Sequence, residues 1–181
     1  LYEAQKMLKE AQEEDDKTGL SRCYNIMSQI YTVKRLDSMA FEWQLKEIEL
    51  TEKYDLENYN ISQTYSQISS YYINTNQPEK ALEALKKADA TAYSPTQKIS
   101  VQLEYVNYYS KFGDMQAAEK ILNECKTAFD QDKRLWSIKK RLYNIEYVYY
   151  LQSKQYPKAL EAAKKQEAEE LNLSESIQNS V

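Results

Sequence analysis

Apolar residues recur along this chain every three or four positions, with polar residues between them. Four apolar residues separated by four, three and four positions would share one side of an α-helix: Ile61, Tyr65, Ile68 and Tyr72. Two later groups have the same kind of spacing: Ala81, Leu85 and Ala88, and then Ala118, Leu122 and Cys125. The pattern therefore predicts amphipathic helices along most of the chain.

Residues that begin or end helices lie between these stripes. Pro78 suits the first position of a helix, and Gly113 followed by Asp114 is typical of one helix ending and the next being capped. The stretch from Ser94 to Gln97 has the S-x-x-Q form of a capping box, with a proline at the first helical position. The units are therefore predicted to be helix, tight turn, helix.

A longer repeat is also visible. The phrase YYINTNQPEKALEAL at residues 71–85 returns almost unchanged as YYLQSKQYPKALEAA at residues 149–163. A tyrosine nine positions before an alanine occurs four times in register: Tyr31 and Ala40, Tyr72 and Ala81, Tyr109 and Ala118, Tyr150 and Ala159. Successive tyrosines are 41, 37 and 41 residues apart, which indicates one recurring unit.

This pattern resembles the tetratricopeptide repeat, which places a large residue, a leucine with a small neighbour, a tyrosine and an alanine at fixed positions of two helices. The first two units match it closely, through Tyr24, Met27-Ser28, Tyr31 and Ala40, and through Tyr65, Ile68-Ser69, Tyr72, Ala81 and Ala88. The third unit departs at Gln102 and Val106, and the fourth at Tyr147. The resemblance implies an all-α fold, a right-handed superhelix of about four helix pairs with partial units at both ends.

We expect a single helical-repeat domain over residues 1–181. Its parts are the second helix of a truncated repeat at 1–16, repeats at 18–55, 57–91, 94–130 and 133–170, and the start of a further helix at 171–181. Units of 41 residues exceed the usual length of about 34, and the excess follows the alanine. Because whole added turns keep the same face inward, we expect longer helices rather than longer loops.

Composition agrees with helices and excludes some partners. The chain has only 2 glycines and 3 prolines, 42% hydrophobic residues and 29% charged residues. A net charge of −4 and a pI near 5.1 argue against nucleic-acid binding, which needs a basic surface. No apolar run approaches the roughly 20 residues of a membrane span, so we expect no direct membrane insertion of this segment.

Candidate chemistry is sparse. The chain has no histidine, so serine and cysteine nucleophiles lack their commonest base, and two distant glycines cannot form a phosphate-binding loop. Cys23 and Cys125 fall in different units and are expected to be free thiols. We therefore expect no enzyme activity, no metal site and no cofactor.

The resemblance also suggests a binding surface, because ligands of tetratricopeptide proteins contact fixed positions of the first helices. Thirteen such positions form the predicted concave peptide-binding face: Arg22, Asn25, Gln29, Gln63, Ser66, Ser70, Asn74, Ser100, Asn107, Ser110, Arg141, Asn144 and Gln152. Their amides and hydroxyls would pair with the backbone of an extended peptide. Arg22 and Arg141 would hold an acidic side chain or a terminal carboxylate. The alternative is that these polar residues only keep a concave surface hydrated.

These observations predict a non-catalytic module that binds a protein or peptide segment. By resemblance it would be the sensing or interaction region of a larger bacterial signalling protein, in the periplasmic part of a membrane-anchored parent or, alternatively, in the cytoplasm. The second hypothesis is a structural scaffold or dimerisation array in a multiprotein assembly, with a homodimer as one possible form.

Overall fold

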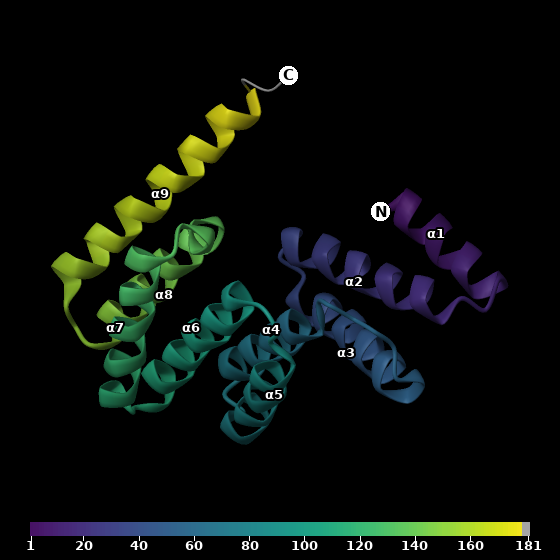
Figure 1. Cartoon of the computed structure of the whole chain (residues 1–181), viewed down its shortest axis with the longest axis horizontal. Helices are drawn as coiled ribbons and strands as arrows, with labels where there is room; N and C mark the ends of the chain where they lie inside the picture. Colours follow the sequence, from purple (N-terminus) through teal and green to yellow (C-terminus); the bar gives the residue numbers. More distant parts are fainter. Residues whose placement is uncertain (179–181) are drawn as a thin grey trace. The chain divides into compact units, whose positions relative to one another are not determined.

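The computed structural model describes the backbone of residues 1–178 and the side chains of residues 1–171. Every regular element in that part of the chain is a helix, and it contains no strand (Figure 1). The chain divides into two compact units, Leu1–Thr91 and Ala92–Val181. The predicted all-α helical-repeat fold is confirmed, since consecutive helices pack as pairs within each unit.

The first unit contains five helices: α1 (Tyr2–Glu13), α2 (Lys17–Val33), α3 (Asp37–Tyr54), α4 (Ile61–Asn74) and α5 (Pro78–Thr91). α2 pairs with α3 and α4 pairs with α5, while α1 packs on α2 and α3 packs on α4. A small apolar cluster of Ala11, Leu20 and Cys23 joins α1 to α2, with Leu50 of α3 against it. α1 lies within residues 1–16, where the second helix of a truncated repeat was predicted.

The second unit contains α6 (Pro95–Phe112), α7 (Met115–Gln131), a short 3-10 helix η1 (Lys133–Ile138), α8 (Lys139–Gln152) and α9 (Tyr156–Gln178). α6 pairs with α7 and α8 pairs with α9, and α6 also packs directly on α8. Its core is one continuous apolar cluster that includes Leu103, Leu122, Phe129 and Leu142.

The recurring alanine near the start of the second helix of each pair is buried. Ala40, Ala81, Ala118 and Ala159 are all buried, with at most 4% of their surface exposed. The Ser69 hydroxyl of α4 donates a hydrogen bond of 3.0 Å to the Ala81 carbonyl of α5. A larger residue at this position would push the pair apart, which explains why the alanine recurs with the repeat.

The turn inside each pair contains one residue with a left-handed backbone, always four positions after the recurring tyrosine. These residues are Arg35 (φ 57°), Asn76 (φ 59°), Gly113 (φ 98°) and Lys154 (φ 59°). In three of these turns the next N–H donates to the carbonyl of that tyrosine, for example from Gln155 to Tyr150 at 2.8 Å. The sequence repeat is therefore also a repeat of backbone conformation.

The predicted helix boundaries around α5, α6 and α7 are confirmed. α5 begins at Pro78, and Ser94 and Gln97 form the reciprocal capping box that begins α6. Gly113 ends α6, and the Asp114 carboxylate accepts a hydrogen bond from the Ala117 N–H at the start of α7.

Two length expectations need correction. No new helix begins at residue 171, because α9 continues unbroken through residue 178; the sequence there contains strong helix formers and neither glycine nor proline. Residues 179–181 of that predicted segment lie outside the described residues. In the first repeat the extra residues divide between an 18-residue α3 and a loop at residues 55–60, because Asp55 adopts a left-handed conformation (φ 48°) and ends the helix.

Cys23 and Cys125 are both buried free thiols, as predicted. Burial raises the pKa of Cys125 to about 12, so this thiol stays protonated at neutral pH. Among the described residues, no group of three or more His, Cys, Asp or Glu side chains could hold a metal ion. No helix of residues 1–178 has both the length and the apolar character needed to cross a bilayer.

The turn at Gly113 gives a test of the repeated backbone conformation. A Cβ added to Gly113 would meet no atom within 4 Å, so a Gly113→Ala variant isolates the backbone strain of a positive φ. We expect it to lower the free energy of unfolding by about 1–2 kcal/mol in urea denaturation. Lys154→Gly, at the equivalent turn, should change stability by less than about 0.5 kcal/mol. Equal effects of the two substitutions would contradict this interpretation.

A polar groove between α2 and α4

In the first unit, α2 and α4 both pack on α3 and make little direct contact with each other. A groove therefore lies between them, with α3 as its floor. Its walls are two helical stripes: Arg22, Asn25, Gln29 and Thr32 on α2, and Gln63, Gln67, Ser70 and Asn74 on α4. Asn60, the last residue of the loop before α4, lies at one end. Its floor is a third stripe: Asp37, Ala40, Gln44 and Glu47 on α3. We call this surface the α2/α4 groove.

Two cavities occupy the groove. The first, of about 550 Å³, is lined by five residues of α2, by Glu47 and by residues 56–60 of the following loop. The second, of about 470 Å³, lies towards the other end of α2, at Thr32, and is lined by Asp37 and Gln44 of α3 and by Ser70 and Asn74 of α4. Both fall in the size range of ordinary ligand pockets.

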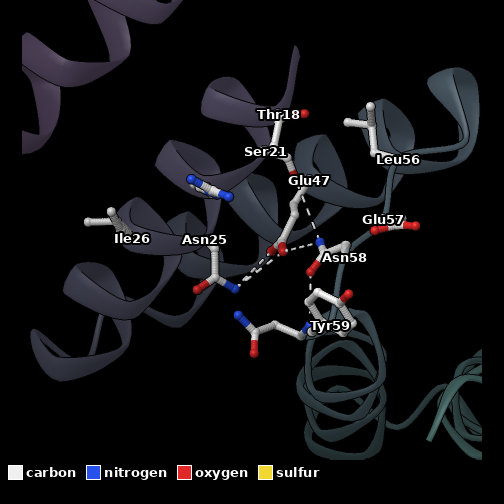
Figure 2. A pocket seen from close by; sticks show the side chains of 11 residues that line it. Thr18, Ser21, Asn25, Ile26, Glu47, Leu56, Glu57, Asn58 and Tyr59 are labelled. Carbon is white, nitrogen blue, oxygen red and sulfur yellow. Dashed lines mark hydrogen bonds between the residues drawn. The ribbon is translucent and has the colours of Figure 1, made fainter. Parts of the chain in front are cut away.

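Glu47 lies at the centre of the first cavity, with only 1% of its surface exposed. Figure 2 shows its carboxylate between Asn25 of α2 and Asn58 of the loop. The Asn58 amide donates at 2.9 Å, the Thr64 hydroxyl of α4 at 3.1 Å, and the Asn25 amide at 3.2 and 3.3 Å to the two oxygens. One carboxylate thus connects α2, α3, the loop and α4.

These donors are all neutral, so the buried charge of Glu47 has no cation against it. Burial raises the pKa of this carboxyl above its ordinary value of 4.5, and the hydrogen bonds from Asn58, Asn25 and Thr64 oppose that rise. The other charged residues of the cavity lining are Arg22 on α2 and Glu57 in the loop, both solvent-exposed.

The second cavity has a similar polar floor. Gln44 is 4% exposed, and its amide donates to the Gln67 side-chain oxygen at 3.0 Å. Tyr71, which lines one side, stacks on Phe41 of α3 with ring centroids 4.0 Å apart. The cavity thus has amides at its base and an aromatic pair at its edge, an arrangement suited to a peptide backbone.

Comparison with known families can now be set beside this geometry. A family model described as 26S proteasome subunit RPN7 matches residues 32–169, which is well over half of the chain. The chain belongs to the RPN7 family. No curated protein matches it. Membership of the RPN7 family agrees with the helical-repeat fold and does not single out the tetratricopeptide type of repeat.

The start of the RPN7 match divides the groove into a part inside the match and a part outside it. The match begins at Thr32, so it includes the floor and the α4 wall of the groove but leaves most of α2 outside. The α2 wall, with Arg22, Asn25 and Gln29, is therefore the part of the groove about which the family match says least.

The predicted binding residues of the first unit mostly lie on this groove. Arg22 and Asn25 line the first cavity, Ser70 and Asn74 line the second, and the Gln29 amide donates to Asn25 at 2.6 Å. Gln63 is exposed on the α4 wall. Ser66 differs: it is 2% exposed and donates to the Ser62 carbonyl within α4, so its hydroxyl does not face the groove.

The predicted residues of the second unit are placed differently, because α6 and α8 pack directly on each other. Arg141 donates to the buried Glu104 carboxylate at 2.9 Å, and Asn107 donates to its other oxygen at 2.9 Å. Arg141 is therefore engaged by the chain itself rather than exposed for an acidic ligand. Ser110 is buried, Ser100 is half-buried, and Asn144 and Gln152 are exposed.

Sequence reasoning missed the floor of the groove, because it considered only first helices. Gln44, Glu47 and Thr51 continue the buried stripe of Ala40 along α3, at spacings of four, three and four. Polar residues in the apolar stripe of a helix are a signal that could have been read from the sequence. No sequence pattern indicated the hydrogen bond from Asn58 to Glu47, because it depends on the path of the loop at residues 55–60.

The raised pKa of Glu47 predicts a specific pH dependence. The folded chain holds this proton more tightly than the unfolded chain, so folding loses stability as pH rises from about 4.5 through the raised pKa. A Glu47→Gln variant lacks this loss. We expect the stability of the wild type relative to Glu47→Gln, measured by urea unfolding, to fall as the pH is raised above about 4.5. Glu49→Gln, exposed on the same helix, is the control, and a difference that grows with pH would contradict the assignment.

The Glu104–Arg141 pair gives a second stability test. Arg141→Met would leave a buried carboxylate without its cation, and we expect a loss of about 2–3 kcal/mol in urea unfolding. The adjacent Lys140 pairs with Glu170 at the surface, so Lys140→Met should cost less than about 1 kcal/mol. The double variant Glu104→Gln, Arg141→Met should recover part of the loss; equal costs for the two single variants would rule out a special role for this pair.

Proposed function

We propose that the chain is a non-catalytic protein-interaction scaffold, one module of a multiprotein assembly. The observation that carries this proposal is the match of residues 32–169 to a family described as a subunit of the 26S proteasome, an assembly of many proteins. Stacked helix pairs supply long surfaces with repeated side-chain positions, which suits them to holding partner proteins.

Within this role, the α2/α4 groove is our candidate for the surface that holds a partner segment. Arg22 and Thr32 are ten residues apart on α2, which is roughly 15 Å along a helix. An extended peptide covers that distance with about five residues. The groove presents amides and hydroxyls on both walls and on its floor, and such groups pair with both the N–H and the C=O of an extended backbone.

The chemistry of the groove supports binding rather than catalysis. The chain contains no histidine, and the carboxylate of Glu47 is held by three neutral donors instead of facing a nucleophile. The nearby hydroxyl of Ser21 is shared with Thr51 and Asn58. No group in the groove is arranged to activate another for attack.

We further propose that the four helix pairs are tetratricopeptide-like. The support is the joint recurrence of the left-handed turn residue and the buried alanine five positions later, from Arg35 and Ala40 to Lys154 and Ala159. A sensing role in a bacterial signalling protein is a second candidate function, favoured by the pocket-sized cavities of the groove. Solution mass separates the two candidates, because a sensor is expected to be a monomer and an assembly array to form a tight dimer.

Phage-displayed random dodecapeptides, selected against the wild-type chain, test the groove. We expect enriched peptides to lose binding at least tenfold when the exposed amides on the two walls are truncated together, as Gln29→Ala, Gln63→Ala and Asn74→Ala. The matched control truncates three exposed amides of α7: Gln116→Ala, Asn123→Ala and Gln131→Ala. Circular dichroism would verify helicity for both. Unchanged binding to the groove variant, or no enrichment at all, would remove the groove from the proposed function.

A further inference from the structure

The charges that line the α2/α4 groove are unbalanced. The two cavities together are lined by three carboxylates, Asp37, Glu47 and Glu57, and by one cation, Arg22. Two of the carboxylates lie on the α3 floor, ten residues and thus roughly 15 Å apart. The lining of the surface where an acidic ligand was expected therefore contains more carboxyl groups than cations.

Glu47 is the most informative of these groups, because burying a carboxylate without a cation is unfavourable. Its longest hydrogen bonds come from Asn25, at 3.2 and 3.3 Å, and one amide hydrogen-bonds both oxygens. Asn25 stands on the cavity wall and also accepts a hydrogen bond from Gln29. A cationic group entering the cavity could replace this weak donor while Asn58 and Thr64 stay in place.

Arg22 does not reverse this balance. It is exposed on the wall of the first cavity, and the exposed Glu57 lines the same cavity from the loop. The long side chain of Arg22 can turn towards Glu57 or towards the backbone carbonyls of a bound segment. Arg141, the other arginine expected to attract an acidic ligand, is bonded to Glu104 in the second unit.

We propose that the α2/α4 groove selects a basic segment of a partner protein, with one lysine or arginine side chain opposite Glu47 and a second near Asp37. This inference rests on the proposed function and specifies the partner's chemistry. The roughly 15 Å between Glu47 and Asp37 corresponds to basic residues about four or five positions apart in an extended chain. A nucleic acid does not fit, because its phosphates would face three carboxylates.

Three mixtures of acetylated, amidated dodecapeptides would test the inference. They are identical except that two fixed positions, four apart, carry lysine, glutamate or glutamine. Each mixture is titrated into the ¹⁵N-labelled full chain, and the amide chemical shifts of the groove residues are monitored. The shifts give an apparent affinity for each mixture. We expect the lysine mixture to bind at least tenfold more tightly than the glutamate mixture, and its affinity to fall at higher salt.

Substitutions at Glu47 and Asp37 test whether these carboxylates cause the preference for the lysine mixture. Glu47→Gln and Asp37→Asn should each weaken the lysine mixture several-fold more than they weaken the glutamine mixture, whereas the exposed Glu49→Gln should alter neither. If Glu47→Gln fails to fold, Asp37→Asn and Glu57→Gln, both at exposed residues, provide the same comparison.

Two results would overturn the charge inference: tighter binding of the glutamate mixture at the groove, or binding of the lysine mixture that these variants leave unaffected. Either result would still leave the groove as a binding surface. Absence of groove shifts with all three mixtures would overturn this inference and groove binding together. The same titration with a uridine dodecamer would overturn the choice of a protein partner if it shifted the groove amides more strongly.

Discussion

Close contact between two helices across an alanine is the interaction on which the rest of this structure depends. At Ala40, Ala81, Ala118 and Ala159 the small side chain is buried, and the partner helix approaches closely enough for Ser69 to bond the Ala81 carbonyl. Most of the stability of a helix in a protein comes from packing of its apolar face rather than from the helix alone. The pair is stable because its apolar stripes bury each other and, within each unit, bury further area against the neighbouring pair.

A groove can form only where the first helices of neighbouring pairs do not pack directly on each other. In the second unit, α6 and α8 pack directly, and Glu104, Asn107 and Arg141 satisfy one another across them. In the first unit, α2 and α4 stand apart on α3, and the loop at residues 55–60 contributes Asn58 to the gap. Similar first-helix sequences thus produce a packed contact in one unit and an open polar groove in the other.

Much of the fold could be predicted because its determinants are local. Capping by Ser94 and Asp114, the glycine turn at Gly113 and the proline start at Pro78 depend on residues within four positions of one another. The predicted helix start at residue 171 was wrong, since neither glycine nor proline interrupts α9 there. Most of the predicted binding residues on α2 and α4 lie on the groove, whereas on α6 and α8 Asn107 and Arg141 bond the buried Glu104.

The sequence by itself determined the helices, their pairing and the repeated turn, because helical periodicity, caps and a left-handed turn residue act over a few positions of the chain. Only the tertiary structure decided that Glu47 is buried among neutral donors, that Arg141 is bonded to Glu104, and that the lining of the groove carries three carboxylates and one cation. These properties depend on the distance between neighbouring helix pairs. That distance results from the summed packing of many side chains and the course of one loop, which no short segment of sequence specifies.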